Sequence, residues 1–161
     1  MTDVLPDVNV REDLCKIIDA LDLKKGVELG VCSGDFSVYL LENSGLEKLY
    51  SVDAWSTDED LTRSVFKRWA IRKGQLDEQE AETRRRLGEF GPRSEIVKGL
   101  TFDVVDKFPD AHCDFIYVDA SHRFSGVALD LIKWWPKLKV GGIFAGHDYW
   151  KCYRYEVIRS R

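Results

Sequence analysis

The stretch VELGVCSGDFS, residues 27–37, decides the fold of this chain. It opens with a compact apolar run typical of a buried strand, and Gly30 and Gly34 then stand four residues apart. A helix is expected over residues 34–43, and a second apolar run, KLYSVDAW, occupies residues 48–55. A strand, a helix and a second strand in this order build a unit of parallel sheet.

The rest of the chain repeats this alternation. Further strands are expected in SEIVKG (94–99), CDFIYVDA (113–120) and VGGIFAGHDY (140–149), and helices over residues 9–21, 77–87 and 125–138. Near-continuous apolar strands of a parallel sheet need helices on both faces. The sequence therefore predicts one α/β domain over residues 1–161, a three-layer αβα sandwich with a doubly wound, mostly parallel sheet.

Two local expectations come from helical periodicity. In the helix over residues 125–138, Val127, Leu131 and either Trp134 or Trp135 are expected to face the core. Upstream, a helix is expected to start at Ser56, and Gly74 is expected to interrupt the helical pattern.

Composition narrows the classes of partner. A net charge of −4 gives no basic excess for neutralising phosphates, which argues against a general nucleic-acid binder. No apolar run approaches the ~20 residues of a membrane span. The four cysteines form no CxxC pair, so free thiols in a reducing cytoplasm are the simplest interpretation. We expect a cytoplasmic protein that acts on a small molecule, without a nucleic-acid or membrane partner.

The polar residues at strand ends indicate where a ligand binds. Gly30, Asp53, Asp119 and Asp148 each follow an expected strand, and ligands of open α/β sheets bind outside the carboxyl ends of the strands. A dinucleotide loop needs glycine two and five positions after Gly30, where this chain has Cys32 and Asp35. This disfavours a phosphate-binding loop.

A nucleoside ligand without phosphate, such as S-adenosylmethionine (SAM), suits the pattern better. Gly30 and Gly34 let the backbone pass close to it, and Glu28 can accept from the loop amides or from the ligand's ammonium group. Asp53 is placed for the two ribose hydroxyls, and Ala54 and Trp55 for the adenine face. The alternative is purely structural, with Glu28 as a cap and Asp53 as a turn residue.

The same stretch resembles motif I of the class I SAM-dependent methyltransferases, in its E-L-G-V-x-x-G form. DFIYVDASHRFSGVALDLIKWWPKLKVGGIFAGHDY, residues 114–149, resembles the second half of that domain. The nearest group is the small bacterial and phage methyltransferases akin to macrocin-type sugar O-methyltransferases, and more distantly the catechol O-methyltransferases. The resemblance covers roughly residues 10–150 and implies a Rossmann-like methyltransferase fold.

The resemblance also implies roles for individual residues. Glu28, Gly30 and Gly34 would shape the methionine pocket, and Asp53 would bind the ribose. Gly99 and Leu100, which follow the third strand, would flank the adenine. Asp119, at the end of the fourth strand, would lie at the boundary between SAM and the acceptor.

Transfer of a methyl group to a hydroxyl requires that the acceptor lose its proton, and two routes fit. In one, Asp119, Asp148 and His147 hold a divalent metal such as magnesium, which lowers the pKa of the acceptor hydroxyl. A histidine in that set makes magnesium less certain, because magnesium prefers oxygen ligands. In the other, His122 or His147 is the general base and Asp119 orients it.

The end of the chain departs from the family pattern. Family members normally finish the sheet with an antiparallel pair of strands, whereas here only WKCYRYEVIRSR, residues 150–161, follows Tyr149. We therefore expect the last two strands to be missing, leaving the fifth strand as an apolar edge unless the tail or a second chain covers it. A homo-oligomer associated through this edge is predicted.

The expected function is O-methylation of a hydroxyl on a small molecule or sugar. Two alternatives remain open at this point. One is a SAM-binding protein without turnover, because lost strands would remove part of the acceptor pocket. The other is a nicotinamide-dependent enzyme.

Overall fold

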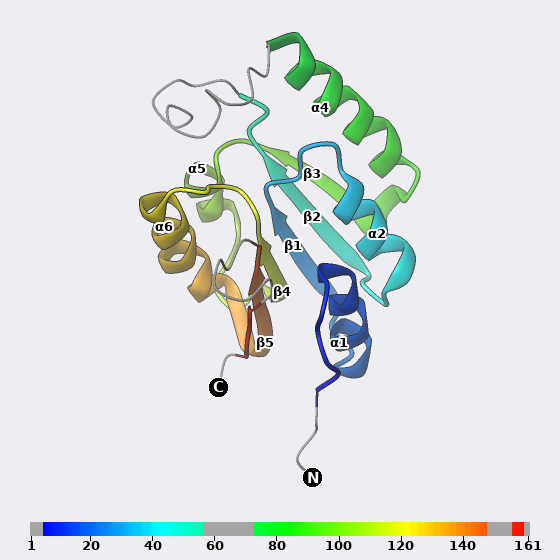
Figure 1. Ribbon diagram of the computed structural model, residues 1–161, viewed down its shortest axis with the longest axis vertical. Coiled ribbons are helices and arrows are strands. Elements are labelled where there is room, and N and C mark those ends of the chain that lie inside the picture. The colour runs from blue at the N-terminus through cyan, green and yellow to red at the C-terminus, as the bar shows by residue number, and fades with distance from the viewer. Residues whose placement is uncertain (1–4, 57–72, 148–155, 160–161) are drawn as a thin grey trace.

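The computed structural model describes residues 5–56, 73–147 and 156–159 (Figure 1). Within these ranges lies a six-stranded sheet with the order β3-β2-β1-β4-β5-β6. Strands β1 to β5 are parallel, and β6 runs antiparallel to β5. Their bounds are β1 Lys25–Leu29, β2 Lys48–Asp53, β3 Ser94–Lys98, β4 Cys113–Val118, β5 Leu138–Gly146 and β6 Glu156–Arg159. The predicted doubly wound sheet is confirmed.

Helices cover both faces of this sheet (Figure 1). The described elements on one face are α1, α2 and α4, and those on the other are α5 and α6. Their bounds are α1 Leu14–Ala20, α2 Asp35–Asn43, α4 Lys73–Gly88, α5 Thr101–Val104 and α6 Phe124–Trp134, with 3₁₀ turns η1 Arg11–Asp13, η2 Gly91–Arg93, η3 Val105–Lys107 and η4 Trp135–Lys137. In the described part of the chain, no helix is long and apolar enough to cross a membrane.

The central strands supply side chains to two separate cores. In β4, Phe115 and Tyr117 pack with the core under α1 and α2, whereas Ile116 and Val118 pack with the core under α5 and α6. This alternation follows from the two-residue period of a strand, and it explains why β4 has to be apolar throughout. The predicted three-layer sandwich is confirmed.

Two helix boundaries differ from the sequence-based expectation. The helix expected over residues 9–21 divides into η1 and α1, because the Asp13 carboxylate accepts the N–H groups of Asn9 (3.0 Å) and Val10 (3.2 Å) and closes a turn first. Gly74, expected to interrupt the helical pattern, lies in the first turn of α4, which therefore starts before the expected Asp77. A single glycine costs a helix only about 1 kcal/mol, which the following turns offset. The helix expected to begin at Ser56, and with it the pattern upstream of Gly74, falls on residues 57–72, outside the described ranges.

The inward face of α6 also differs from the expectation. Leu131, predicted to face the core, is 41% exposed, whereas Asp130 is 2% and Trp134 0% exposed. The rotation of the helix follows from two contacts with α5, because the Thr101 hydroxyl donates to the Asp130 carboxylate and the Trp134 ring N–H donates to the Thr101 carbonyl. A buried polar contact therefore overrides the apolar periodicity.

The tail of the chain pairs with the fifth strand. Residues 156–159 form β6, which lies antiparallel to residues 143–146 of β5. The expectation that both final strands are missing is therefore wrong for one of them, and β5 is covered over these four residues. The prediction of self-association assumed that the edge of β5 is unpaired, and residues 143–146 of this edge are paired with β6.

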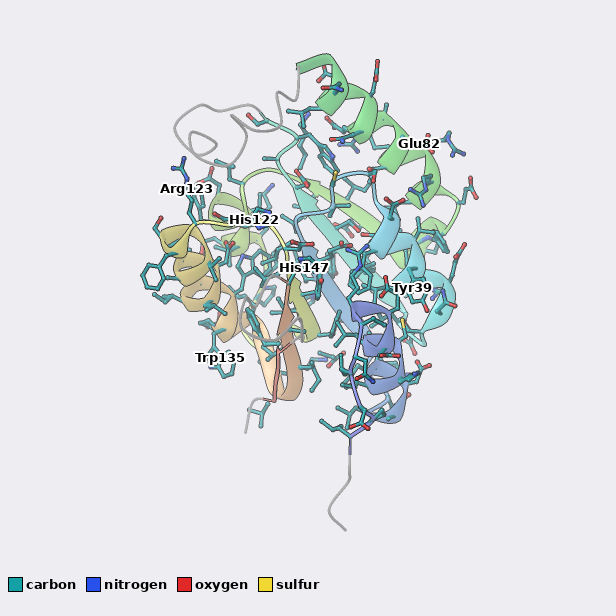
Figure 2. All side chains as sticks on the ribbon, in the orientation of Figure 1. Tyr39, Glu82, His122, Arg123, Trp135 and His147 are labelled. Carbon is teal, nitrogen blue, oxygen red and sulfur yellow. The ribbon has the colours of Figure 1, made fainter. Side chains whose placement is uncertain are left out.

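The two adjacent tryptophans of α6 and η4 provide a stability test of the fold. Trp134 is fully buried and packs against Phe108 with ring centroids 4.9 Å apart, whereas Trp135 is 43% exposed and points outward (Figure 2). We expect Trp134→Ala to lower the unfolding free energy by about 3–5 kcal/mol and Trp135→Ala by about 1 kcal/mol. Urea denaturation measures both, and Trp134→Phe serves if the alanine variant does not fold. Equal losses at the two positions would contradict the described rotation of α6.

Candidate functional site

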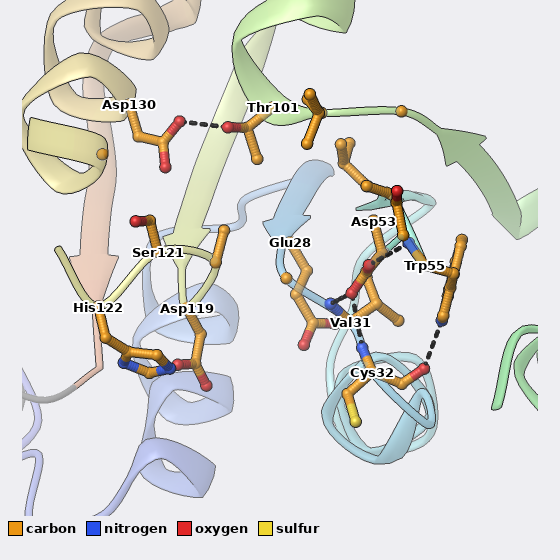
Figure 3. A pocket seen from close by; sticks show the side chains of 18 of the residues that line it. Glu28, Val31, Cys32, Asp53, Trp55, Thr101, Asp119, Ser121, His122 and Asp130 are labelled. Carbon is orange, nitrogen blue, oxygen red and sulfur yellow. Dashed lines mark hydrogen bonds between the residues drawn. The ribbon is translucent and has the colours of Figure 1, made fainter. Parts of the chain in front are cut away.

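The carboxyl ends of strands β1 to β4 border a pocket of about 490 Å³ (Figure 3). Backbone hydrogen bonds join neighbouring strand ends: Gly30 donates to the Val52 carbonyl (2.9 Å), and Asp119 donates to the Leu29 carbonyl (2.7 Å). The segments that follow the four strands line the pocket. It lies where the strand order reverses between β1 and β4, as expected for a doubly wound sheet.

Gly30 and Gly34, the two glycines of the segment VELGVCSGDFS, have different structural roles. Gly30 lines the pocket with φ 89°, and a Cβ there would lie 2.2 Å from the Asp119 carbonyl oxygen. Glycine is therefore required for the close approach of the β1 and β4 loops. Gly34, with φ 80°, is the N-cap of α2 and is not among the described residues that line the pocket. Its contribution is the turn into the helix.

Asp53 braces the loop between β1 and α2. One carboxylate oxygen accepts the N–H groups of Val31 (2.8 Å) and Cys32 (2.9 Å), and the other accepts the N–H of Trp55 (2.8 Å). The sequence-based interpretation offered Glu28 as the acceptor for these loop amides, and the structure assigns them to Asp53 instead. Ala54 and Trp55, which follow Asp53, line the pocket as expected.

The conformation of Cys32 explains how the loop is held on its other side. Cys32 has φ 54°, a left-handed conformation that costs a non-glycine residue about 1–2 kcal/mol. Its carbonyl accepts hydrogen bonds from the Trp55 ring N–H (2.8 Å) and from the Thr83 hydroxyl (2.9 Å). These bonds offset the strain, and they fix the Trp55 indole at the pocket wall.

Glu28 is a buried acid that lines the pocket with only 2% of its surface exposed. Ser37 donates a hydrogen bond to its carboxylate, and the Ser37 hydroxyl lies 2.7 Å from that of Ser51. Burial raises the pKa of Glu28 to about 8; the Ser37 hydrogen bond opposes the rise and the charges of Asp119 and Asp53 add to it. The side chain is therefore protonated at neutral pH and can ionise when a cation arrives.

The candidate catalytic residues gather beyond the end of β4. Asp119 and His122 line the pocket, and the Nδ1 atom of His147 lies 3.7 Å from a carboxylate oxygen of Asp119. His147 is brought there by the pairing of β5 with β4, since its N–H donates to the Val118 carbonyl (3.0 Å). His122 lies in the loop between β4 and α6 (Figure 2).

The predicted metal site is only partly described. Asp148, its third ligand, lies outside the described residues. Among the residues that are described, no group of three or more His, Cys, Asp and Glu side chains could hold a metal ion. The metal route therefore stays a prediction.

Gly99 and Leu100 line the pocket directly after β3, where the sequence placed them. Several further lining residues were not predicted from the sequence, among them Arg11, Thr101 and Asp130. Asp130 is 2% exposed and burial raises its pKa, so its carboxyl group is a buried acid at the pocket wall. An acid inside the apolar helix segment FSGVALDLIKW was the available signal for it. Arg11 lies far from the motifs in sequence and had no such signal.

The raised pKa of Glu28 can be tested through stability. The folded protein keeps a proton that the unfolded chain loses, so wild-type stability falls as pH rises from the ordinary value of 4.5 through about 8. Glu28→Gln has no carboxyl group to titrate, so we expect its unfolding free energy not to show this decrease. Relative to wild type, the variant should gain a few kcal/mol of unfolding free energy as the pH is raised from 5 to 9. Urea denaturation across this range measures it, with the exposed Glu95→Gln as control. Parallel profiles for Glu28→Gln and wild type would contradict the assignment.

Solved structures of similar fold include several methyltransferases. A candidate caffeoyl-CoA O-methyltransferase from Staphylococcus aureus matches with a TM-score of 0.63 at 17% identity, over 89% of this chain and 59% of that one. The O-methyltransferase from Bacillus cereus in complex with SAH matches with a TM-score of 0.58 at 17% identity, over 88% and 59%. An rRNA methylase from Streptococcus thermophilus matches with a TM-score of 0.55 at 16% identity, over 86% and 69%.

At these identities the likeness concerns the fold alone, and this chain spans 59% of the length of each of the first two structures. No curated protein sequence matches the chain. None of these findings bears on the macrocin-type group, which stays a prediction.

The sequence itself carries the family assignment. The model of the family described as "Methyltransferase domain" matches residues 27–149, which is more than half of the chain. The match begins at the strand before the glycine turn and extends past β5, so it includes all four strand ends that border the pocket. The chain belongs to this family of methyltransferase domains.

Proposed function

We propose that this protein binds SAM at the described pocket and transfers its methyl group to a hydroxyl oxygen of a small molecule. The charge of the pocket carries the proposal. Its described lining holds five carboxyl groups and two guanidinium groups, from Glu28, Asp35, Asp53, Asp119, Asp130, Arg11 and Arg123. Acidic groups outnumber basic ones in this lining, which disfavours a pyrophosphate, and the protonated Glu28 can ionise beside a sulfonium or ammonium cation. The nicotinamide alternative is disfavoured on the same ground.

The nucleoside would lie at the end of the pocket formed after β2 and β3. A carboxylate has about four lone-pair positions, and three of those on Asp53 already accept loop N–H groups. This leaves room for one ribose hydroxyl, fewer than the two expected from the sequence. Trp55, Gly99 and Leu100 supply surfaces for adenine beside it.

The reacting end would lie at Asp119. SAM supplies a methyl group on a positively charged sulfur, and the acceptor oxygen displaces that sulfur while its proton leaves. We infer that His147 takes the proton at Nε2, because its Nδ1 is turned toward Asp119 at 3.7 Å. His122 is a second candidate base and, unlike His147, it is among the described residues that line the pocket. A divalent metal held by Asp119, His147 and Asp148 is the competing route.

The acceptor is proposed to be a small hydroxylated molecule, for which a sugar is the first candidate. SAM binding without turnover remains the second candidate function. This chain matches 59% of the S. aureus structure and 59% of the B. cereus structure, so the remaining parts of those two proteins have no counterpart in the match. A panel of hydroxylated sugars and phenols, assayed for release of S-adenosylhomocysteine (SAH), distinguishes the two. Binding of SAH by calorimetry with no turnover on any acceptor would favour the second.

The role of Asp53 is testable by binding. We expect Asp53→Asn to weaken SAH binding by about 10- to 100-fold, because the variant loses charged hydrogen bonds to the loop and to the ribose. Isothermal titration calorimetry measures the affinity. Asp110→Asn is the matched control, since Asp110 is a surface residue paired with Lys137. Unchanged affinity in Asp53→Asn would overturn the assignment.

The two routes of proton removal predict different responses to chelation. On the histidine route, turnover is insensitive to EDTA, and His147→Gln lowers kcat by about 10²- to 10⁴-fold while SAH affinity is retained. This is the expected result. Loss of turnover in EDTA with recovery on addition of magnesium would instead establish the metal route.

A further inference from the structure

The basic residues of the pocket have no role in the function proposed so far. Among the described residues of its lining, two are arginines: Arg11 from η1 and Arg123 from the loop before α6. The other charged groups there are carboxyl groups. A positive side chain inside an acidic pocket is a candidate partner for an anionic part of the ligand.

Arg11 lines the pocket and lies against α2, the helix that follows the glycine loop. Its guanidinium carbon stands 4.9 Å from the centre of the Phe36 ring, and its Nε donates to the Glu12 carboxylate (3.2 Å). Phe36 is 2% exposed, so the ring offers a fixed surface for the cation. These two contacts position the guanidinium, and about a third of the Arg11 side chain stays exposed.

The surroundings of Arg11 match the chemistry of an amino-acid group. Burial is the main cause of the raised pKa of Glu28, and the Arg11 charge acts in the opposite direction, which places the guanidinium within electrostatic range of that carboxyl group. A hydrogen bond from Arg86 is the main cause of the lowered pKa of Asp35, the first residue of α2, and the Arg11 charge adds to it, which agrees with the contact of Arg11 to the same helix. A ligand with its nucleoside at Asp53 would extend its amino-acid tail toward Arg11.

A zwitterionic tail needs partners of both signs when it leaves water. Glu28 and Asp119 line the pocket and would be partners for its ammonium group. Its carboxylate would be left among like charges unless a cation is present, and an unpaired buried carboxylate is strongly disfavoured. The planar fork of an arginine can bind a carboxylate through two parallel hydrogen bonds.

We propose that Arg11 binds the α-carboxylate of the methionine moiety of SAM and of the homocysteine moiety of SAH. This inference rests on the proposed function and adds a determinant of ligand specificity from outside the matched family region, which begins at residue 27. The segment before β1 is thereby part of the binding site, and ligands without the carboxylate lose the benefit of Arg11.

The test compares SAH with its decarboxylated analogue, which keeps the nucleoside, the sulfur and the ammonium group. Titration calorimetry on the full chain gives the affinity of wild type, Arg11→Gln and Arg11→Lys for each. We expect Arg11→Gln to weaken SAH binding by about 10- to 100-fold and Arg11→Lys by less, while affinity for the analogue changes less than about threefold. The surface variant Arg84→Gln, which removes an arginine from the outer side of α4, should leave both affinities unchanged.

The outcomes separate this inference from the proposed function. Equal weakening of both ligands in Arg11→Gln would show that Arg11 acts on the structure of the pocket, and would overturn the inference. Unchanged SAH affinity in Arg11→Gln would also overturn it. The same holds if Arg123→Gln, and not Arg11→Gln, removes the preference for SAH over its decarboxylated analogue. Failure of the wild type to bind SAH at all would overturn the proposed function first. Thermal denaturation of each variant verifies that it is folded.

Discussion

The site depends on the carboxylate of Asp53 and the three backbone N–H groups that it accepts. Two of these come from the loop after β1 and one from the residues after β2, so one side chain sets the spacing of both loops. Gly30 makes the arrangement possible on the other side, because only glycine allows that loop to lie against the backbone of Asp119. A loop held from both sides is pre-organised for a ligand, which lowers the conformational entropy lost on binding.

The pocket beside Asp53 is lined by several acidic side chains whose environments differ. Glu28 is buried and protonated at neutral pH, whereas Asp53 is engaged with backbone N–H groups and Asp119 lies beside His147. The carboxyl groups can therefore serve separate ends of one ligand. This distribution favours a cationic nucleoside over a phosphate ester, and agrees with membership of a methyltransferase family.

Much of this could be predicted from the sequence. The parallel sheet followed from apolar runs, and the pocket followed from the polar residues at the strand ends, because the carboxyl ends of parallel strands meet at one edge. The periodicity of α6 was a weaker guide. It placed Leu131 inside, but the Thr101–Asp130 contact turned the helix and buried the acid. For the edge of β5, the sequence left open whether the tail or a second chain covers it, and the structure shows that residues 156–159 of the tail do so.

The sequence by itself determined the strand order along the chain, the glycine turn and the acids that border the pocket, because these depend on local pattern and on spacing within one motif. Only the tertiary structure decided which carboxylate accepts the loop amides, which tryptophan is buried, and that Arg11 and Asp130 reach the pocket. Those features depend on how helices rotate and pack against strands that are distant in sequence. Such rotations are set by contacts between side chains that no single segment contains.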